Sequence, residues 1–391
     1  MTYRIDMADE DSAQFDHSKR SRDWAATMAG HLTSDIRLAH ADSWAGPGTT
    51  EIADRFARED ADAGILAPLA THATGSGTRA IDEQPDEYRT CFERDRDRIL
   101  HASAFRRLSG KTQVFVFPHD HQRTRLTHAL EVAQVAVSVA RALRLNVALT
   151  EAIALGHDCG HGPGGHASED ALSPYIDGGY DHAVWGSDVV LVSLNLCTQT
   201  LDGIRNHSWS RPAPGTPEGE VVSWADRIAY VCHDFEDAVA AGVVTPQQLP
   251  DLVRTRCGVS RAQQLRTFIH SMIQASAATG RIGMVPDIAD ALAAFRQFNY
   301  DQVYLRPESQ AQAQAVIDLL RSLVDHFASH PRDLPLESDF APADPGSTLA
   351  VRNAVTYVGG MTDRFACRQA ITLLQYDTSK LPQGIDTSIE Q

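Results

Sequence analysis

The segment from Leu126 to Leu145 constrains the fold more than any other part of the chain, because it is apolar on two sides along its whole length. Its apolar residues recur every three to four positions, and the polar ones are confined to one strip. A helix of this kind is buried in a helical bundle. The first apolar stripe is Leu126, Leu130, Ala133, Val137 and Ala140, and the second is Val132, Val135 and Val139.

A second predicted helix follows directly and ends in a histidine–aspartate pair. Asn146 is a suitable N-cap, and Leu149 and Ile153 lead in steps of four residues to His157. His157 and Asp158 therefore leave an inward-facing stripe at a helix end. The residues that follow break the helix and predict a tight loop that carries His161 and His166; they are Gly160, Gly162, Pro163, Gly164 and Gly165.

A third helix is predicted from Ser223 to about Ala241, with Gly242 just beyond its end. Asp226, Tyr230 and Asp234 recur every four residues and share a face that the packing stripe does not use. The packing stripe consists of Trp224, Ile228, Val231, Phe235 and Val239. A Pro/Gly-rich loop, 211–219, precedes this helix.

Strand-type alternation is scarce from about Tyr88 onward, so we expect an all-α fold with one main domain in this chain of 391 residues. Residues 1 to about 80 are polar and rich in turn residues, which indicates an extension with partial order. The remaining expectations are short helices at Asp35–Ala41 and Ile52–Ala67, an amphipathic helix at Ala311–Ala328, a Pro/Asp linker at His330–Ser347 and a polar tail at the end.

The formal net charge of −16 means that nucleic acids and acidic membranes will be repelled unless basic residues are concentrated locally. A basic stretch provides this concentration, and arginine suits bidentate contacts with phosphate. Glu93, Asp95 and Asp97 could instead pair with Arg94–Arg98 on a solvated helix, so both readings stay open there. The stretch comprises Arg94, Arg96, Arg98, Arg106, Arg107, Lys111, Arg123 and Arg125.

The six cysteines form no C-x-x-C pair, and no charged-then-apolar leader opens the chain. A reducing cytoplasm without a disulfide framework is therefore the expectation. No apolar run approaches the roughly 18 residues that a membrane-spanning helix needs, so we expect no membrane association.

His128, the His157–Asp158 pair and Asp226 combine imidazole and carboxylate groups on buried helices, a ligand set that suits Mn, Mg, Fe or Zn. Taken singly, each histidine could equally be a hydrogen-bonded core residue. Zinc held through Cys159 and His161 is a rival, but Cys159 has no partner cysteine nearby. A catalytic thiol at Cys159 is a further alternative that nothing around it supports.

The order H…HD…D resembles the HD superfamily of metal-dependent phosphohydrolases. More specific segments resemble the dGTP triphosphohydrolase family, and the resemblance runs from about Tyr88 to Leu374. These segments are RDRILHASAFRRL from Arg96, KTQVF from Lys111, RTRLTHALEVA from Arg123, ADRIAY from Ala225, YLRPES from Tyr304 and GMTDRFA from Gly360.

We expect a polar, partly ordered N-terminal extension at 1–85, which has no counterpart in the family, an HD-domain core with the metal and nucleotide site at 86–242, a C-terminal helical part packed on the core at 243–380 and a tail at 381–391. The resemblance implies cleavage of deoxynucleoside triphosphates (dNTPs) to deoxynucleoside and triphosphate, with a divalent metal such as Mn, Mg, Fe, Ni or Zn. Such proteins form tetramers or hexamers, often with a dNTP effector.

The resemblance also assigns roles to individual residues. The implied metal ligands are His128, His157, Asp158 and Asp226. The implied catalytic residues are His166, as the group that moves a proton, with His161 in the same loop and Glu169 orienting His166. The implied substrate-binding residues are Arg125, His182 and Arg227 at the phosphates, Tyr230 and Asp234 at the sugar, and Gln113 where a 2′-hydroxyl would collide.

The sequence departs from the family pattern at several positions. Gly164 and Cys159 stand where the family usually has Phe and Leu, a His-Asn pair reads His182-Ala183, and a Lys-His-Asn segment reads Arg205–Ser208. Two other functions stay open. One is an HD phosphohydrolase acting on nucleoside monophosphates, (p)ppGpp or a phosphodiester, and the other is a non-catalytic protein that binds nucleotides or single-stranded nucleic acid.

Overall fold

The computed structural model describes residues 18–33, 35–118, 121–335 and 340–384. The chain divides into two compact units, Met1–Ile52 and Ala53–Gln391. In its described part, the first unit contains helix α1 (Lys19–Thr27) and an antiparallel hairpin of β1 (His31–Leu32) and β2 (Arg37–Leu38).

The short helix predicted for Asp35–Ala41 is wrong, since Arg37–Leu38 is a strand. Leu32 pairs with Arg37, and the Thr33 amide donates to the Ile36 carbonyl at 2.9 Å, so the backbone groups are satisfied across the hairpin. Seven residues without a packing face are too few to sustain a helix by themselves. The other predicted short helix is confirmed as α2 (Arg55–Ile65).

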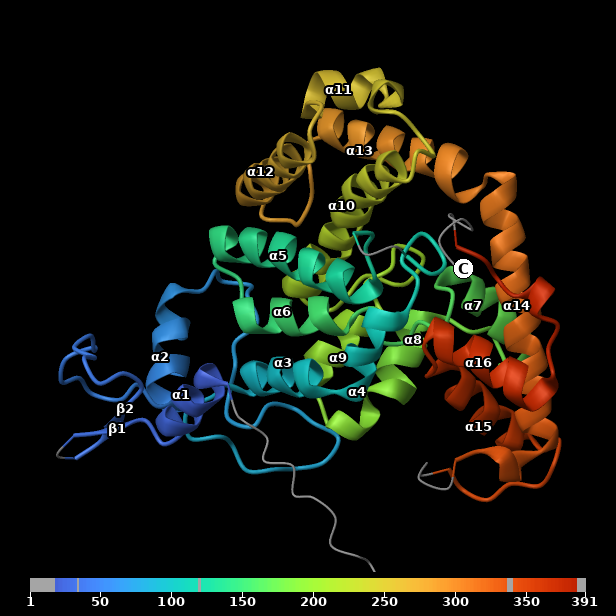
Figure 1. Ribbon diagram of the computed structural model, residues 1–391. Helices are drawn as coiled ribbons and strands as arrows, with labels where there is room; N and C mark the ends of the chain where they lie inside the picture. Colours follow the sequence, from blue (N-terminus) through green and yellow to red (C-terminus); the bar gives the residue numbers. More distant parts are fainter. Residues whose placement is uncertain (1–17, 34, 119–120, 336–339, 385–391) are drawn as a thin grey trace, which may run out of the picture. The chain divides into compact units, whose positions relative to one another are not determined.

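The second unit is built on long helices that lie one above another, with α6 packed against α3, α5 and α10 (Figure 1). These helices are α3 (Cys91–His101), α5 (Arg125–Leu143), α6 (Val147–Gly156) and α10 (Pro217–Ala240). Shorter helices surround them: α4 (Ser103–Arg107), α7 (His166–Leu172), α8 (His182–Trp185) and α9 (Thr198–Arg205). The predicted all-α fold is confirmed.

Helix α5 confirms the first prediction, and almost all of both apolar stripes is buried. Leu126 is half-buried, and Leu130 is 48% exposed, so the first stripe is wrong at Leu130. The Asn146 side chain accepts a hydrogen bond from the Leu149 amide at 3.1 Å and caps α6 as expected. These two helices place His128 and His157 in the buried interior.

Helix α10 begins at Pro217, six residues before the predicted start at Ser223. Proline at the first helical position has a suitable φ and lacks an amide that would otherwise be unsatisfied. The Thr216 side chain accepts from the Gly219 amide and caps the helix. The predicted loop at 211–219 is therefore wrong from Pro217 onward, where α10 has already begun.

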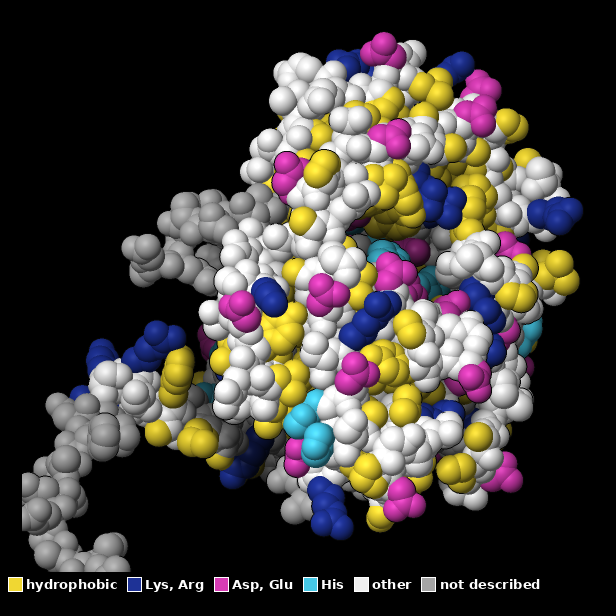
Figure 2. Space-filling view, turned by 90° about the vertical axis from the view of Figure 1, so that its right-hand side faces the viewer, with side chains coloured by type: hydrophobic (Ala, Val, Ile, Leu, Met, Phe, Trp, Pro, Cys, Tyr) yellow, Lys and Arg dark blue, Asp and Glu magenta, His cyan; other side chains and the backbone are white. Residues whose placement is uncertain are grey.

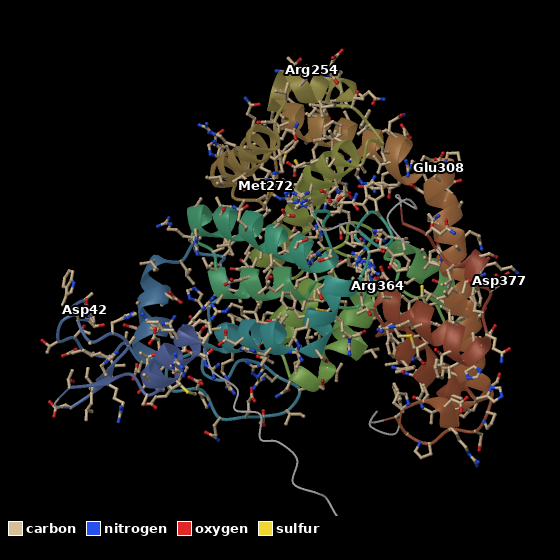
Figure 3. The ribbon with its side chains drawn as sticks, viewed as in Figure 1. Asp42, Arg254, Met272, Glu308, Arg364 and Asp377 are labelled. Carbon is tan, nitrogen blue, oxygen red and sulfur yellow. The ribbon has the colours of Figure 1, made fainter. Side chains whose placement is uncertain are left out.

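The C-terminal helices divide between two hydrophobic clusters. In the first, α11 (Asp251–Cys257), α12 (Arg261–Thr279) and α13 (Pro286–Asn299) pack with α10, and Met272 of α12 is fully buried (Figure 3). The second is formed by α14 (Pro307–Ser329), α15 (Thr348–Gly359) and α16 (Asp363–Leu374), together with α7. The helix predicted at Ala311–Ala328 is confirmed within α14.

Single helical turns join the longer elements. The 3-10 turns are Leu108–Gly110, Ser173–Tyr175, Val192–Leu194, Pro246–Gln248, Pro331–Asp333 and Thr378–Lys380, and the π-helical turns are Gly186–Val190 and Tyr300–Tyr304. Most of the predicted tail at 381–391, and part of the predicted linker at His330–Ser347, lie outside the described residues. Among the helices that are described, none is long and apolar enough to cross a membrane.

Candidate active site

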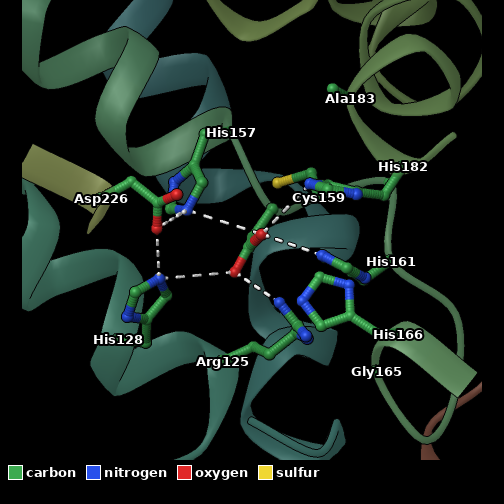
Figure 4. Close-up of polar contacts among 12 residues, drawn as sticks. Arg125, His128, His157, Cys159, His161, Gly165, His166, His182, Ala183 and Asp226 are labelled. Carbon is green, nitrogen blue, oxygen red and sulfur yellow. Dashed lines mark hydrogen bonds and ion pairs between the residues drawn. The ribbon is translucent and has the colours of Figure 1, made fainter. Parts of the chain in front are cut away.

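Four side chains from three helices meet in the centre of the second unit (Figure 4). His128 lies in the first turns of α5, His157 is the C-cap of α6 and Asp226 lies in α10, while Asp158 follows His157 directly. The Nε2 atom of His128 is 3.1 Å from Asp226 Oδ1 and 3.8 Å from Asp158 Oδ2. The Nε2 atom of His157 is 3.5 Å from Asp158 Oδ1 and 3.7 Å from Asp226 Oδ1.

The donor atoms of these four residues fit a divalent metal ion. His157 Nδ1 lies 2.7 Å from the Ala154 carbonyl, which can only accept, so Nδ1 carries the hydrogen and Nε2 presents a lone pair. This buried Nε2 has no hydrogen-bond partner. Ligand atoms bound at ~2.0–2.2 Å to one ion lie roughly 3.0–3.6 Å apart, close to the spacing found here.

Asp158 is held ionised by its neighbours. Burial would raise the pKa of its carboxyl, but the Arg125 guanidinium and the histidines around it outweigh burial and hold the pKa well below the usual range. Arg125 NH1 donates to Asp158 Oδ2 at 2.8 Å. The Nε and NH2 atoms of Arg125 are buried without a partner, so this side chain keeps two nitrogens free for an anion.

The loop after the His157–Asp158 pair depends on a glycine at its tightest point. A Cβ atom on Gly160 would overlap the His182 carbonyl and the Gly186 amide, so the loop can approach α8 only without a side chain there. This approach stacks the ring of His161 on the ring of His182, with 3.7 Å between centroids. His161 Nε2 also lies 3.2 Å from Asp158 Oδ1.

Glu169 of α7 links two histidines at the edge of the site. Its carboxylate oxygens lie 3.1 Å from His166 Nδ1 and 2.8 Å from His182 Nδ1. Burial would raise the pKa of Glu169, but the hydrogen bonds to these two rings outweigh burial and lower it. The His166 side chain is 74% exposed, unlike the other site histidines, so its second nitrogen is open to solvent.

The face of α10 beyond Asp226 meets two residues from the C-terminal helices. Arg296 of α13 donates through Nε to the Tyr230 hydroxyl at 2.7 Å, and the Tyr304 hydroxyl donates to Asp234 Oδ2. Burial raises the pKa of Asp234 to about 7, and its other oxygen, Oδ1, is buried without a partner. This face therefore offers an unsatisfied acceptor beside an aromatic ring.

Two predicted substrate-binding residues lie apart from these hydrogen bonds. The Arg227 guanidinium stacks over the ring of Trp209, 3.5 Å from its centroid, and burial lowers the pKa of Arg227. The carbonyl oxygen of the Gln113 side chain is buried without a partner. Neither side chain contacts the four central residues through a hydrogen bond or ion pair.

The basic stretch does not form one phosphate-binding surface. Of the ion pairs expected within this helix, Arg96 pairs with Asp97, whereas Arg94 and Arg98 pair with Glu83. Glu93 and Asp95 pair with Arg58 and Arg79 instead. Farther along, Arg123 pairs with Glu131, Glu236 and Asp237, and Lys111 donates to the carbonyls of His161 and Gly359. Arg125 is the member that reaches the central four residues.

The thiol of Cys159 is not activated. Burial raises its pKa to about 12, and its sulfur donates only a long contact of 3.9 Å to the Leu155 carbonyl. This environment opposes both a catalytic thiol and a zinc-bound thiolate at this position.

Four residues at the site were not predicted from the sequence to have a role there. They are His207, Trp209, Arg296 and Tyr304. His207 was noted only as a departure from the family pattern, yet its ring lies edge-on to His157 with 4.9 Å between centroids. Tyr304 falls in the YLRPES segment, which was a usable signal. Arg296 and Trp209 carry no motif.

The space-filling view shows that one face is hollowed, with histidine side chains at the floor and basic and hydrophobic side chains at the rim (Figure 2).

Two regions of the chain match known protein families. Residues 125–231 match the HD domain, and residues 282–371 match the phosphohydrolase-associated domain. The HD match begins at Arg125 and includes all four central residues, whereas Arg296 and Tyr304 lie in the second match.

Curated relatives cover most of the chain. A deoxyguanosinetriphosphate triphosphohydrolase-like protein of Caldanaerobacter subterraneus is 39% identical over 83% of this chain and 95% of its own length. A protein of the same description from Clostridium perfringens is 37% identical over 78% of this chain and 92% of its own length. Among solved structures, a hypothetical protein from Aquifex aeolicus is 17% identical over 73% of this chain and 69% of its own, with a TM-score of 0.47.

Proposed function

Because the chain belongs to the family of deoxyguanosinetriphosphate triphosphohydrolase-like proteins, we propose that it hydrolyses dNTPs to the deoxynucleoside and intact triphosphate. The bond to be broken joins the α-phosphorus to the 5′-oxygen of the sugar. The reaction depends on a divalent metal, with Mn and Mg as the first candidates.

His128, His157, Asp158 and Asp226 would hold the ion. Their donor atoms converge, three of the four residues are buried, and His157 Nε2 has no partner, which supports the proposal. A divalent ion there would polarise a phosphate oxygen and lower the pKa of a water molecule toward ~7. Arg125 keeps Asp158 ionised and orients its carboxylate.

The triphosphate of the substrate carries close to four negative charges at neutral pH, so several cationic groups are needed around it. Arg125 has two buried nitrogens without a partner. Arg227 and His182 are the other proposed phosphate contacts. The Trp209 ring fixes the Arg227 guanidinium, so less side-chain entropy is lost when an anion binds.

His166 is the proposed proton carrier, and His161 is its neighbour in the loop. Glu169 accepts from His166 Nδ1, which leaves Nε2 as the nitrogen that exchanges a proton with water or with the 5′-oxygen. This arrangement orients the ring of an otherwise exposed side chain.

Tyr230, Asp234 and Gln113 are the proposed sugar contacts. Asp234 Oδ1 and the Gln113 side-chain oxygen are both buried acceptors without partners, as expected for groups that bind hydroxyls of a ligand. The Tyr230 ring, fixed through Arg296, would pack against the sugar and disfavour a 2′-hydroxyl.

One observation carries the proposal: a single face of α10 joins the metal-site carboxylate of Asp226 to Tyr230 and Asp234, one and two turns farther along. A phosphate at the ion and a sugar beside Tyr230 would therefore be adjacent parts of one ligand. An HD phosphohydrolase acting on a simple phosphate would have no use for this face.

The test is to incubate the purified protein with each dNTP and each rNTP in Mn²⁺ and in Mg²⁺, and to resolve the products by ion-exchange chromatography. Deoxynucleoside plus tripolyphosphate is the expected pair, with dNTPs turned over faster than rNTPs. Monophosphate plus pyrophosphate, or orthophosphate alone, would assign the protein to a different HD reaction.

A further inference from the structure

Cys91 and Cys197 bring two thiols together at a place that the proposed function does not use. Cys91 is the first residue of α3, and Cys197 is the N-cap of α9. Both cysteines are buried, with exposed fractions of 1% and 0%, and a side-chain hydrogen bond joins their sulfur atoms. Both are free thiols in the structure, so the fold places a reduced cysteine pair in direct contact.

One buried ion pair fixes the backbone beside both thiols. Asp95 lies one turn after Cys91 on the same face of α3, and its Oδ2 accepts from the Cys197 amide at 2.8 Å. Arg79 pairs with Asp95 Oδ1 at 2.6 Å and donates through NH2 to the Cys91 carbonyl at 2.9 Å. The two cysteines are therefore held against the same side of α3 by contacts that do not involve their sulfurs.

A turn with a glycine at its closest point covers the two thiols. The Gly77 amide donates to the Thr74 carbonyl at 2.9 Å, and the φ of Gly77 is +75°. A Cβ atom on Gly77 would lie 2.4 Å from Cys197 Sγ and 3.2 Å from Cys91 Sγ, so only glycine lets the turn approach both sulfurs. Residues 75–77 are partly exposed, so the cover between the thiols and solvent is thin.

The two sulfurs differ in how readily they lose a proton. Hydrogen bonds from the Cys197 thiol and the Thr74 amide outweigh burial and lower the pKa of Cys91. The bond to Cys91, together with burial, raises the pKa of Cys197. The N-terminus of α3 also favours a thiolate at Cys91. An oxidant therefore reacts first at Cys91, with Cys197 beside it as the resolving thiol.

We propose that Cys91 and Cys197 are a redox pair that hydrogen peroxide converts reversibly to an intramolecular disulfide. The Cys91 thiolate attacks one peroxide oxygen, the O–O bond breaks, and the other oxygen takes up a proton and leaves as water. Cys91 is then a sulfenic acid. Cys197 loses its proton and attacks the Cys91 sulfur, which forms the S–S bond and releases the sulfenic oxygen as a second water. Two thiols lose two electrons and two protons, and the peroxide is reduced to two waters.

The disulfide would join α3 to α9, and both helices pack against α6, which ends at the His157 cap. A cross-link between segments so far apart in the sequence restricts the unfolded chain, so oxidation should raise the melting temperature. The proposal is independent of the proposed function, because no step in it involves a nucleotide or a metal ion.

The test treats the reduced, full-length protein with hydrogen peroxide and measures the masses of the intact chain and of its proteolytic peptides. We expect the loss of two hydrogen atoms, a linked peptide pair that contains Cys91 and Cys197, and reversal by dithiothreitol. The melting temperature should be higher for the oxidised protein. Cys91→Ser and Cys197→Ser should each abolish the link, whereas Cys367→Ser, at another buried cysteine, is the matched control that should keep it.

The wild-type measurement needs no variant to fold. The number of thiols titrated in denaturant should fall by two after peroxide treatment, with the chain still a monomer on a non-reducing denaturing gel. An unchanged thiol count, a link between other cysteines such as Cys232 and Cys257, or oxygen added to Cys91 without a link to Cys197 would each overturn the proposal.

Discussion

The candidate site has two parts that are built in different ways. The helix-held part consists of His128, His157, Asp158 and Asp226, whose side chains are at most 21% exposed and come from three packed helices. The loop-held part consists of His161 in the glycine loop and of His166 and Glu169, which lie in the first turn of α7 directly after that loop, so the predicted loop position of His166 is wrong; the His166 side chain is 74% exposed. The first part is fixed by hydrophobic packing behind it, and the second by hydrogen bonds between side chains.

The difference follows from what each part has to do. Metal ligands must hold their positions with little contact from competing water, and buried helices provide this. A group that exchanges protons needs access to solvent or to a bound ligand. The two parts should therefore respond differently to substitution, in metal content as well as in turnover.

The largest effect is expected from His157→Ala in the helix-held part. Removing the unsatisfied Nε2 should abolish binding of the metal ion, and turnover should fall by more than the ~10²–10⁴-fold that loss of a proton-transfer group costs. Metal content per chain and kcat measured together check this, with circular dichroism to confirm folding. Retained turnover without the bound ion would contradict the proposed role of the metal.

In the loop-held part, His166→Ala should leave metal binding unchanged but should lower kcat strongly. The kcat should fall by ~10²–10⁴-fold while metal content stays at the wild-type value, because His166 is no ligand of the helix-held site. Loss of metal in this variant would mean that the two parts are not distinct. His330→Ala, a histidine at the end of α14, is the matched control.

Glu169→Gln should have an intermediate effect. The substitution keeps the shape but weakens the acceptor for His166 and His182, and loss of such an orienting contact costs roughly 10–100-fold. We expect kcat to fall and the pH profile of kcat to shift to lower pH, since burial lowers the pKa of His182 and the Glu169 carboxylate, which outweighs burial and raises that pKa, is lost. An unchanged pH profile would reduce Glu169 to a packing role.

The smallest effect is expected at the sugar side. Tyr230→Phe removes the hydroxyl that accepts from Arg296, and loss of one hydrogen bond of ~0.5–1.5 kcal/mol should change the dNTP/rNTP ratio of kcat/KM by roughly 3–10-fold. Metal content should not change. Tyr300→Phe, which removes the other phenol bonded to Arg296 at 3.2 Å, is the control that should leave this ratio intact.

The sequence predicts the helix-held part well because local rules determine it. Helical spacing identified α5, the Asn146 cap located α6, and steps of four residues carried Asp226, Tyr230 and Asp234 to one face. These signals span a few turns of one helix each. The start of α10 was missed because Pro217 reads as a loop residue unless its place at the first helical position is recognised.

The loop-held part and its neighbours could not be predicted in this way. His182 meets His207 across 25 positions, and Arg296 meets Tyr230 across 66 positions, so each contact depends on how whole helices pack. No periodicity relates such residues. Lys111 is a further example. It belongs to the basic stretch that the sequence favours for phosphate contacts, but its ammonium group donates to two backbone carbonyls.

In the proposed reaction, the metal site directs water to the α-phosphorus of a dNTP. Hydrolysis of the preferred dNTP in ¹⁸O-labelled water, with mass spectrometry of both products, tests this. One ¹⁸O atom is expected in the tripolyphosphate and none in the deoxynucleoside. Label in orthophosphate, in a nucleotide monophosphate or in the deoxynucleoside would contradict it.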